Sequence, residues 1–284
     1  MKKMLAGLAL ATAATAIAAA PAQAAPKEPV AAVKQQFVPG KGVKFTDRAS
    51  LVEGARRAIL MRRNGTFEFG KSGVTASDIT SKLNIPASML DDEDKALAKP
   101  EHVVTVGRKT YVSGSFWSQD LPAEQPWYKL PISLPSGVFG PTGQLVNITE
   151  PATLKTLLKG AKAGGSGYSG TITFGDLKKV SPWASSSLLL NKQSGKQLKS
   201  VITWKLTVDA KGLPTRLVTS FPSSALAKGD AKGLTISVDS RYSGWGSTVK
   251  VEAPPADQIA TDVKDDSGAP EAPQILGDVG KLFG

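Results

Sequence analysis

The feature that most constrains the fold is a set of strand-like segments in the last third of the chain. Between residues 201 and 208 every second side chain is apolar, and residues 234–242 repeat this pattern. Residues 213–221 and 248–252 read as two further strands. Because consecutive side chains of a strand point to opposite faces, the alternating segments have one apolar and one polar face. Four strands are therefore expected here, with their apolar side chains on one side of a sheet.

The connections between these strands predict their direction. Turn-forming residues occupy 209–212, 228–230 and 244–246, and loops this short join only antiparallel neighbours. An antiparallel sheet with one apolar face needs a cover. Helical spacing near 49–63, 87–98 and 153–163 offers that cover, but these helices are short for a broad sheet. Either the sheet curls around them into a packed core, or a space remains that an apolar molecule fills.

The rest of the chain is read more coarsely. Pro-rich residues 25–44 form an extended lead-in, and residues 45–253 form a single domain. A short strand is expected at 66–69, a strand and its exit at 168–180, a hairpin at 103–113, and a sheet segment at 127–130. A third helical turn is expected at 185–190. Residues 254–284, rich in Pro, Asp and Gly, are expected to form a flexible tail.

The N-terminus predicts export. Lys2 and Lys3 precede an apolar run, and a small-x-small triplet ends at Ala24, so residues 1–24 read as a signal peptide cleaved before Ala25. No second apolar span follows, and no cysteine is available to carry a lipid. The expected location is therefore secreted or associated with the cell envelope, without a lipid anchor.

Composition narrows the chemistry. The absence of cysteine excludes disulfides and cysteine-ligated metal centres. The net charge is +11. For an exported protein this charge favours anionic lipid headgroups and acidic wall polymers over nucleic acid, with transient contact to an anionic membrane surface as one form of binding. The alternative is that the dispersed lysines only confer solubility.

Sequence motifs that would indicate catalysis or metal binding lack their structural context. The glycines at 165, 167 and 170 match the dinucleotide fingerprint but stand between a helix and a strand, the reverse of what phosphate binding requires. His102 is the single histidine, it begins a strand, and no nucleophile elbow accompanies it. The acidic run 91–94 lacks the spacing of a calcium loop. No catalytic residue, metal site or cofactor is predicted.

Two blocks of sequence resemble a known family. The run from Trp204 to Pro214 contains a D-x-x-G-L-P turn, and the run from Leu234 to Pro254 contains Y-S-x-W-G followed by V-x-V-E-A-P. Both are similar to the end of the actinobacterial LppX/LprG-type lipoproteins. Residues 168–174 and 109–112 fit the middle strands of that family. The family carries a lipobox cysteine after its signal peptide, whereas Ala24 and Ala25 stand at that place here.

The resemblance implies an α+β fold like that of LolA and LolB: a strongly curved, half-open antiparallel sheet with helices covering the concave face. It also implies a non-catalytic role, in which a lipid or lipoglycan is held by its acyl chains between sheet and helices. The alternative is a structural or sensory envelope module with a fully packed concave face, which binds protein or wall polymer through its surface. The apolar side chains expected to line the cleft are Phe67, Phe69, Val104, Val106, Ile172, Phe174, Ile202, Trp204, Leu206, Leu217, Leu234, Ile236 and Val238.

Overall fold

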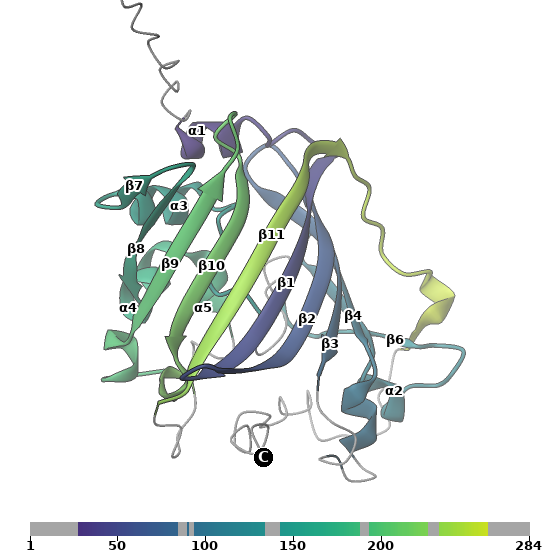
Figure 1. The fold of residues 1–284 in the computed structure, drawn as a ribbon. Helices are drawn as coiled ribbons and strands as arrows, with labels where there is room; N and C mark the ends of the chain where they lie inside the picture. Colours follow the sequence, from purple (N-terminus) through teal and green to yellow (C-terminus); the bar gives the residue numbers. More distant parts are fainter. Residues whose placement is uncertain are drawn as a thin grey trace, which may run out of the picture.

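The computed structural model describes residues 28–84, 90, 94–133, 143–187, 193–226 and 233–260. Its centre is one open sheet of twelve strands in the order β12-β6-β5-β4-β3-β2-β1-β11-β10-β9-β8-β7. All neighbouring strands are antiparallel except β12 and β6. Figure 1 shows the sheet curving around helices that lie behind it. The predicted α+β class, with a curved open sheet and helices on one face, is confirmed.

The longest strands occupy the middle of the sheet, so that the sheet is tallest there. The strands are β1 (Lys41–Glu53), β2 (Arg56–Phe69), β3 (Val74–Leu83), β4 (Glu101–Val106), β5 (Lys109–Gly114), β6 (Trp127–Lys129), β7 (Lys162–Gly164), β8 (Gly167–Thr173), β9 (Val201–Val208), β10 (Pro214–Pro222), β11 (Thr235–Thr248) and β12 (Ile259–Ala260).

The predictions for the last third hold for three of its four strands. β9, β10 and β11 lie side by side and antiparallel, with β11 continuing to Thr248. The expected fourth strand at 248–252 is wrong, because residues 249–255 form no strand. The hairpin at 103–113 is confirmed as β4 and β5, and the expected sheet segment at 127–130 is β6 over its first three residues.

The helix predicted at 49–63 is wrong, because this segment is the hairpin of β1 and β2. The two strands pair from Lys41↔Phe69 to Glu53↔Arg56, and the chain reverses at Gly54, whose φ is +56°. A register shift between Ala49 and Ser50 lets neighbouring residues Leu60 and Met61 both be buried. A bulged strand therefore reproduces the apolar spacing of a helix over a short window.

A layer of short elements covers the inner face of the sheet, and we call it the cover. It consists of α1 (Pro29–Lys34), residues 143–150, α3 (Pro151–Leu158), α4 (Phe174–Val180) and α5 (Pro182–Ser186). α3 confirms a helix near the predicted 153–163, and α5 replaces the turn expected at 185–190, of which residues 188–190 lie outside the described residues. α1 contradicts the extended lead-in predicted at 25–44, and β1 begins at Lys41, four residues before the predicted start of the domain.

Small helical elements also lie outside the cover. They are η2 (Asp94–Ala98), α2 (Trp117–Asp120), η3 (Gln197–Lys199), η4 (Ser223–Ala225) and η5 (Ala256–Gln258). η2 is the described part of the helix predicted at 87–98, of which residues 87–89 and 91–93 lie outside the described residues. α2 packs Trp117 against Val103 and Val112 in a second, smaller hydrophobic core.

The segment after β11 is ordered further than expected. Residues 249–260 pass from the end of β11 to the far edge of the sheet, where β12 pairs with β6 (Figure 1). On the way, the backbone N–H of Val251 donates to the Glu68 carboxylate at 2.7 Å. Residues 254–260 therefore belong to the fold, whereas the rest of the predicted tail, residues 261–284, lies outside the described residues, as do residues 1–27.

Candidate functional site

The inner face of the sheet is one continuous apolar surface. Strand register aligns Ile172 with Ile202 and Leu206 with Leu217, and Ile236 faces Phe221 and Leu51 across β11. Eleven of the predicted lining residues are buried in one hydrophobic core on this side: Phe67, Phe69, Ile172, Phe174, Ile202, Trp204, Leu206, Leu217, Leu234, Ile236 and Val238. Phe174 differs from the others because it begins α4, where its ring meets that of Phe221 edge-on at 5.3 Å.

Two predicted lining residues, Val104 and Val106, are misplaced. Val103 pairs with Ile79 and Val112 on the inner face, so Val104 between Asp78 and Tyr111 faces the outside of the sheet, as does Val106. A run of apolar residues in β4 conceals which side chains point inward. His102 lies on the same outer face and is partly exposed, with 2.7 Å between its Nε2 and Asp78 Oδ1, as expected for a surface histidine.

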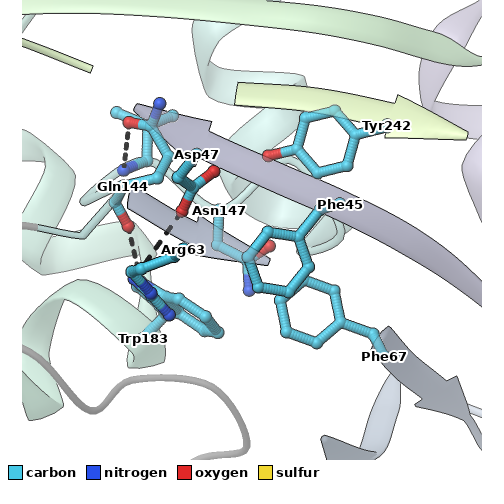
Figure 2. Close-up of a pocket in the computed structure, with 9 residues that line it drawn as sticks. Phe45, Asp47, Arg63, Phe67, Gln144, Asn147, Trp183 and Tyr242 are labelled. Atoms are coloured by element: carbon cyan, nitrogen blue, oxygen red, sulfur yellow. Dashed lines mark hydrogen bonds and ion pairs between the residues drawn. The ribbon is translucent and has the colours of Figure 1, made fainter. Parts of the chain in front are cut away.

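The centre of the inner face is polar. Asp47 on β1 and Arg63 on β2 face each other in the sheet register, with 3.7 Å between Arg63 Nη1 and Asp47 Oδ2. Their side chains are only 5% and 2% exposed. In Figure 2 the two groups lie beside Phe45, Phe67 and Tyr242, which are otherwise apolar surroundings. A charged pair thus stands in the middle of the hydrophobic core.

Gln144 joins this polar centre to the cover. Its amide nitrogen donates to Ser240 Oγ at 3.0 Å, and its amide oxygen accepts from Thr219 at 2.9 Å. Its backbone oxygen accepts from the indole of Trp183 in α5 at 3.1 Å. The preceding residue is glycine for a steric reason, because a Cβ at Gly143 would lie 1.7 Å from Arg63 Nη1. Residues 143–144 are therefore held by side-chain contacts over the buried ion pair.

Glu150 ties the parts of the cover to one another. Its carboxylate accepts from the hydroxyls of Thr153 and Ser181 and from the backbone N–H of Trp183 at 2.8 Å. One carboxylate thereby links the start of α3 to the start of α5, and its charge suits the N-terminal ends of both helices. The cover is connected internally as one layer.

Little space remains between cover and sheet. The cavity bounded by Asp47, Arg63, Asn147, Trp183 and Tyr242 has a volume of about 10 Å³ for the centre of a water-sized sphere. That is roughly the room needed for one water molecule. In this conformation no acyl chain fits at this place.

Burial changes the acidity of two groups in the polar centre. Loss of solvent raises the pKa of Asp47, although the neighbouring Arg63 charge and the Ser240 hydroxyl act in the opposite direction. Burial also raises the pKa of Tyr242, and the nearby Asp47 carboxylate adds to that rise. Both shifts favour the protonated, neutral form of the group in the folded protein.

Tyr242→Phe should protect the fold at alkaline pH. Because the folded pKa of Tyr242 lies above the ordinary 10.0, its contribution to stability is complete below pH 10 and is lost as the pH rises further. The wild type should lose about 1.4 kcal/mol per pH unit through this group, and Tyr242→Phe should not. Urea unfolding between pH 8 and about 11 measures the difference. Parallel decline of the two proteins would contradict the assignment; Tyr168→Phe on β8 controls for loss of a tyrosine.

The residues of the polar centre were missed at the sequence level. Arg63 falls at the end of the helix predicted at 49–63, Asp47 stands just before it, and Gln144 and Trp183 belong to no motif. A usable signal existed for the first two residues: Phe45, Asp47 and Ala49 alternate, as do Met61, Arg63 and Phe67 with glycine at 65 between them. A charge at an apolar position of a strand indicates a buried, paired group.

Among the described residues no cluster of histidine, cysteine, aspartate or glutamate has the arrangement of a metal site. Within the same residues, no helix has the length and hydrophobicity needed to span a membrane. The inner face offers an apolar surface with a polar centre.

Comparison with known proteins gives likenesses of low similarity. No family model and no curated protein sequence matches the chain. A LolA superfamily protein from Nitrosomonas europaea is 10% identical over 75% of this chain and 89% of that chain, with a TM-score of 0.27. A DUF1329 family protein from Desulfovibrio piger is 14% identical over 79% and 96%, with a TM-score of 0.30. A hypothetical protein from Chlamydia trachomatis is 12% identical over 79% and 98%, with a TM-score of 0.28. At these values the likenesses carry no inference about function, and membership of the LppX/LprG-type family stays a prediction.

Proposed function

We propose that this protein is an exported, non-catalytic envelope protein that binds the acyl chains of a lipid or lipoglycan between the inner face and the cover. The observation that carries the proposal is the separation of these two layers. The sheet is held together by continuous backbone pairing across its twelve strands. The centre of the cover is attached to it by side chains, chiefly those of Gln144 and Trp183. A layer attached in this way can move without breaking the sheet.

Binding requires that the cover shifts, because the closed cavity of about 10 Å³ admits no acyl chain. Entry of an acyl chain replaces contacts between cover and sheet with contacts to the ligand, and the free energies of these two sets of contacts are similar in size. Burying an acyl chain of about 16 carbons gains about 13 kcal/mol at roughly 0.8 kcal/mol per CH₂. Uncovering about five large apolar side chains costs about 8–15 kcal/mol in total. Because the free energy gained by burying the acyl chain is close to that lost by uncovering the core, binding is reversible, as a carrier requires.

The inner face also has a polar group available to a ligand. The indole Nε1 of Trp204 is buried and has no hydrogen-bond partner among the described residues. It lies on the inner face beside β8, where the ring passes so close to Gly170 that a Cβ there would be 2.8 Å from the indole. Buried donors are normally satisfied, so an ester or hydroxyl oxygen of an amphiphile is a suitable partner.

The alternative function is favoured by the same small cavity. If the cover never moves, the protein is a packed envelope module that acts through its surface, and the inner face is only its core. The two proposals differ in whether an amphiphile enters.

Native mass spectrometry of protein stripped of lipid and then mixed with a single-chain C16 lysophospholipid separates them. Carriage predicts adducts of one ligand mass and a change in tryptophan emission, because Trp204 lies on the inner face and Trp183 packs against that face from the cover. Thr219→Val removes an anchor of Gln144 while keeping the side-chain shape, and we expect it to speed adduct formation several-fold. Thr203→Val, on the exposed face of β9, is the matched control. If the wild type, Thr219→Val and Thr203→Val all form no adduct, carriage is excluded and the packed envelope module is the function that remains.

A further inference from the structure

The outer face of the sheet carries one cation on each of five consecutive strands. We call these residues the basic row: Arg216 on β10, Arg241 on β11, Arg48 on β1, Arg62 on β2 and Lys82 on β3. All five side chains are exposed. In Figure 1 these five strands lie side by side across the face turned away from the helices.

The strand register places like charges directly opposite one another. Arg216 pairs with Arg241, and Arg48 pairs with Arg62. Arg62 in turn pairs with Lys82. Directly opposed like charges destabilise a sheet, so this arrangement works against the fold. Lysines spread over a surface for solubility do not produce such a row.

One acidic side chain, Asp239 on β11, lies within the row: it pairs with Arg48 in the sheet register, and hydrogen bonding by Arg216 and the nearby charges of Arg216, Arg241 and Arg48 lower the pKa of its carboxyl. Asp239 accepts two hydrogen bonds from Arg216, each 2.8 Å long. Arg48, Arg62, Arg241 and Lys82 make no ion pair within 4.0 Å with any described residue. Four guanidinium or ammonium groups therefore remain available to an external anion.

We propose that the basic row binds an extended polyanion, a wall polymer whose repeating groups are phosphates or carboxylates. Paired cations on neighbouring strands lie about 4.8 Å apart in the direction across the sheet. Between β11 and β1 the row is offset by two residues, because Arg241 pairs with Thr46 and Arg48 pairs with Asp239. The result is a stepped row of cations across five strands, which suits a chain of anionic groups. Arginine, which supplies four of the five cations, matches phosphate and carboxylate oxygens with two donors at once.

A membrane surface fits the row less well than a polymer does. Anchoring in a bilayer needs apolar side chains beside the cations. Among the described residues the large exposed apolar side chains are Val38, Ile132 and Val201, and none belongs to the five strands of the row. The row also lies on the face opposite to the proposed acyl-chain site, so the two activities are separable.

Titration calorimetry with inorganic polyphosphate and with poly-L-glutamate tests the proposal. Either polymer should bind, and the one that binds more tightly shows whether the row prefers phosphate or carboxylate groups. Raising the salt from about 50 to about 200 mM should weaken binding about 50-fold if four cations are engaged. The triple variant Arg48→Gln, Arg62→Gln, Arg241→Gln should bind about 100-fold more weakly, at about fivefold per cation.

The matched control removes three exposed cations elsewhere: Lys155→Gln, Lys159→Gln and Lys211→Gln. It should bind within about threefold of the wild type. The basic-row variant should melt no lower than the wild type, because it relieves opposed charges, and should keep any acyl adducts. Three results would overturn the proposal. The first is an equal loss of affinity in both triple variants, and the second is a lower melting temperature of the basic-row variant with unchanged affinity. The third is binding only to vesicles with anionic lipid.

Discussion

Arg63→Met is expected to lower the free energy of unfolding by about 3–5 kcal/mol. The substitution keeps most of the volume of the side chain but removes the cation that faces Asp47 at 3.7 Å. The Asp47 carboxylate then stays buried among Phe45, Phe67 and Tyr242 without its compensating charge. Urea unfolding at pH 7, followed by tryptophan emission, measures the change.

The neighbouring residue provides the control. Arg62 is exposed on the outer face of the same strand and pairs with two other cations, so Arg62→Met should change stability by less than about 0.5 kcal/mol. The double variant Asp47→Leu, Arg63→Met should regain most of the lost stability, because removing both charges leaves none uncompensated. Equal losses for Arg62→Met and Arg63→Met would show that burial of the pair is not the cause.

The loss caused by Arg63→Met should also depend on pH. Burial already raises the pKa of Asp47, and removal of Arg63 takes away the charge that opposes the rise. A carboxyl with a raised folded pKa contributes its stability below the unfolded pKa and loses it as the pH rises through the folded pKa. The variant should therefore approach the wild type as the pH falls toward the ordinary aspartate pKa of about 3.9, because the raised pKa of Asp47 keeps this carboxyl protonated in the folded protein there.

The last third of the fold was predictable because its signals are local. In β9 the alternation of apolar and polar residues is unbroken from Ile202 to Val208. The loop to β10 is held by Asp209, which accepts from the backbone N–H groups of Lys211 and Leu213. A short loop fixes the partner strand and its direction together. Burial of Ile202, Trp204 and Leu206 on one face followed from the same pattern.

The first hairpin was not predictable from the same rule. β1 and β2 carry a bulge, a buried Asp47, a buried Arg63 and a glycine within the strand, each of which interrupts the expected alternation. Gly65 reads as a helix stop in the sequence, whereas it lies mid-strand, where a Cβ would be 2.5 Å from the backbone oxygen of Asp78 and 3.0 Å from the ring of Phe45. The reason for glycine lies in the neighbouring strands, which are distant in sequence.

The cover depends on contacts between distant segments. Gln144 is held in place by hydrogen bonds with Thr219 and Ser240. Glu150 is held in the same way by Ser181 and Trp183. The basic row likewise becomes visible only when the register brings β10, β11, β1, β2 and β3 together, since its cations are scattered along the chain from Arg48 to Arg241. Composition predicted a positive protein and gave no sign of where the charge concentrates.

Trp183→Ala is expected to cost about 3–5 kcal/mol of folding stability for a different reason than Arg63→Met. The indole is 6% exposed and meets the Phe67 ring edge-on at 5.9 Å. Its removal leaves a cavity between α5 and β2 and deprives the Gln144 backbone oxygen of its donor. This loss should show little pH dependence, whereas that of Arg63→Met should shrink in acid. Trp127→Ala, a half-buried tryptophan on β6 at the far end of the sheet, should cost less than about half as much.

The same variant separates the two functions proposed for the inner face. Removing the indole opens room beside the polar centre, so an acyl chain no longer has to displace that side chain to enter. If the inner face binds acyl chains, C16 lysophospholipid at about 100 times its dissociation constant should restore about 2.7 kcal/mol to Trp183→Ala. The wild type should gain less at the same concentration, because its closed cover opposes entry. If the free energy of unfolding of Trp183→Ala does not change with lipid concentration, the inner face serves only as the hydrophobic core.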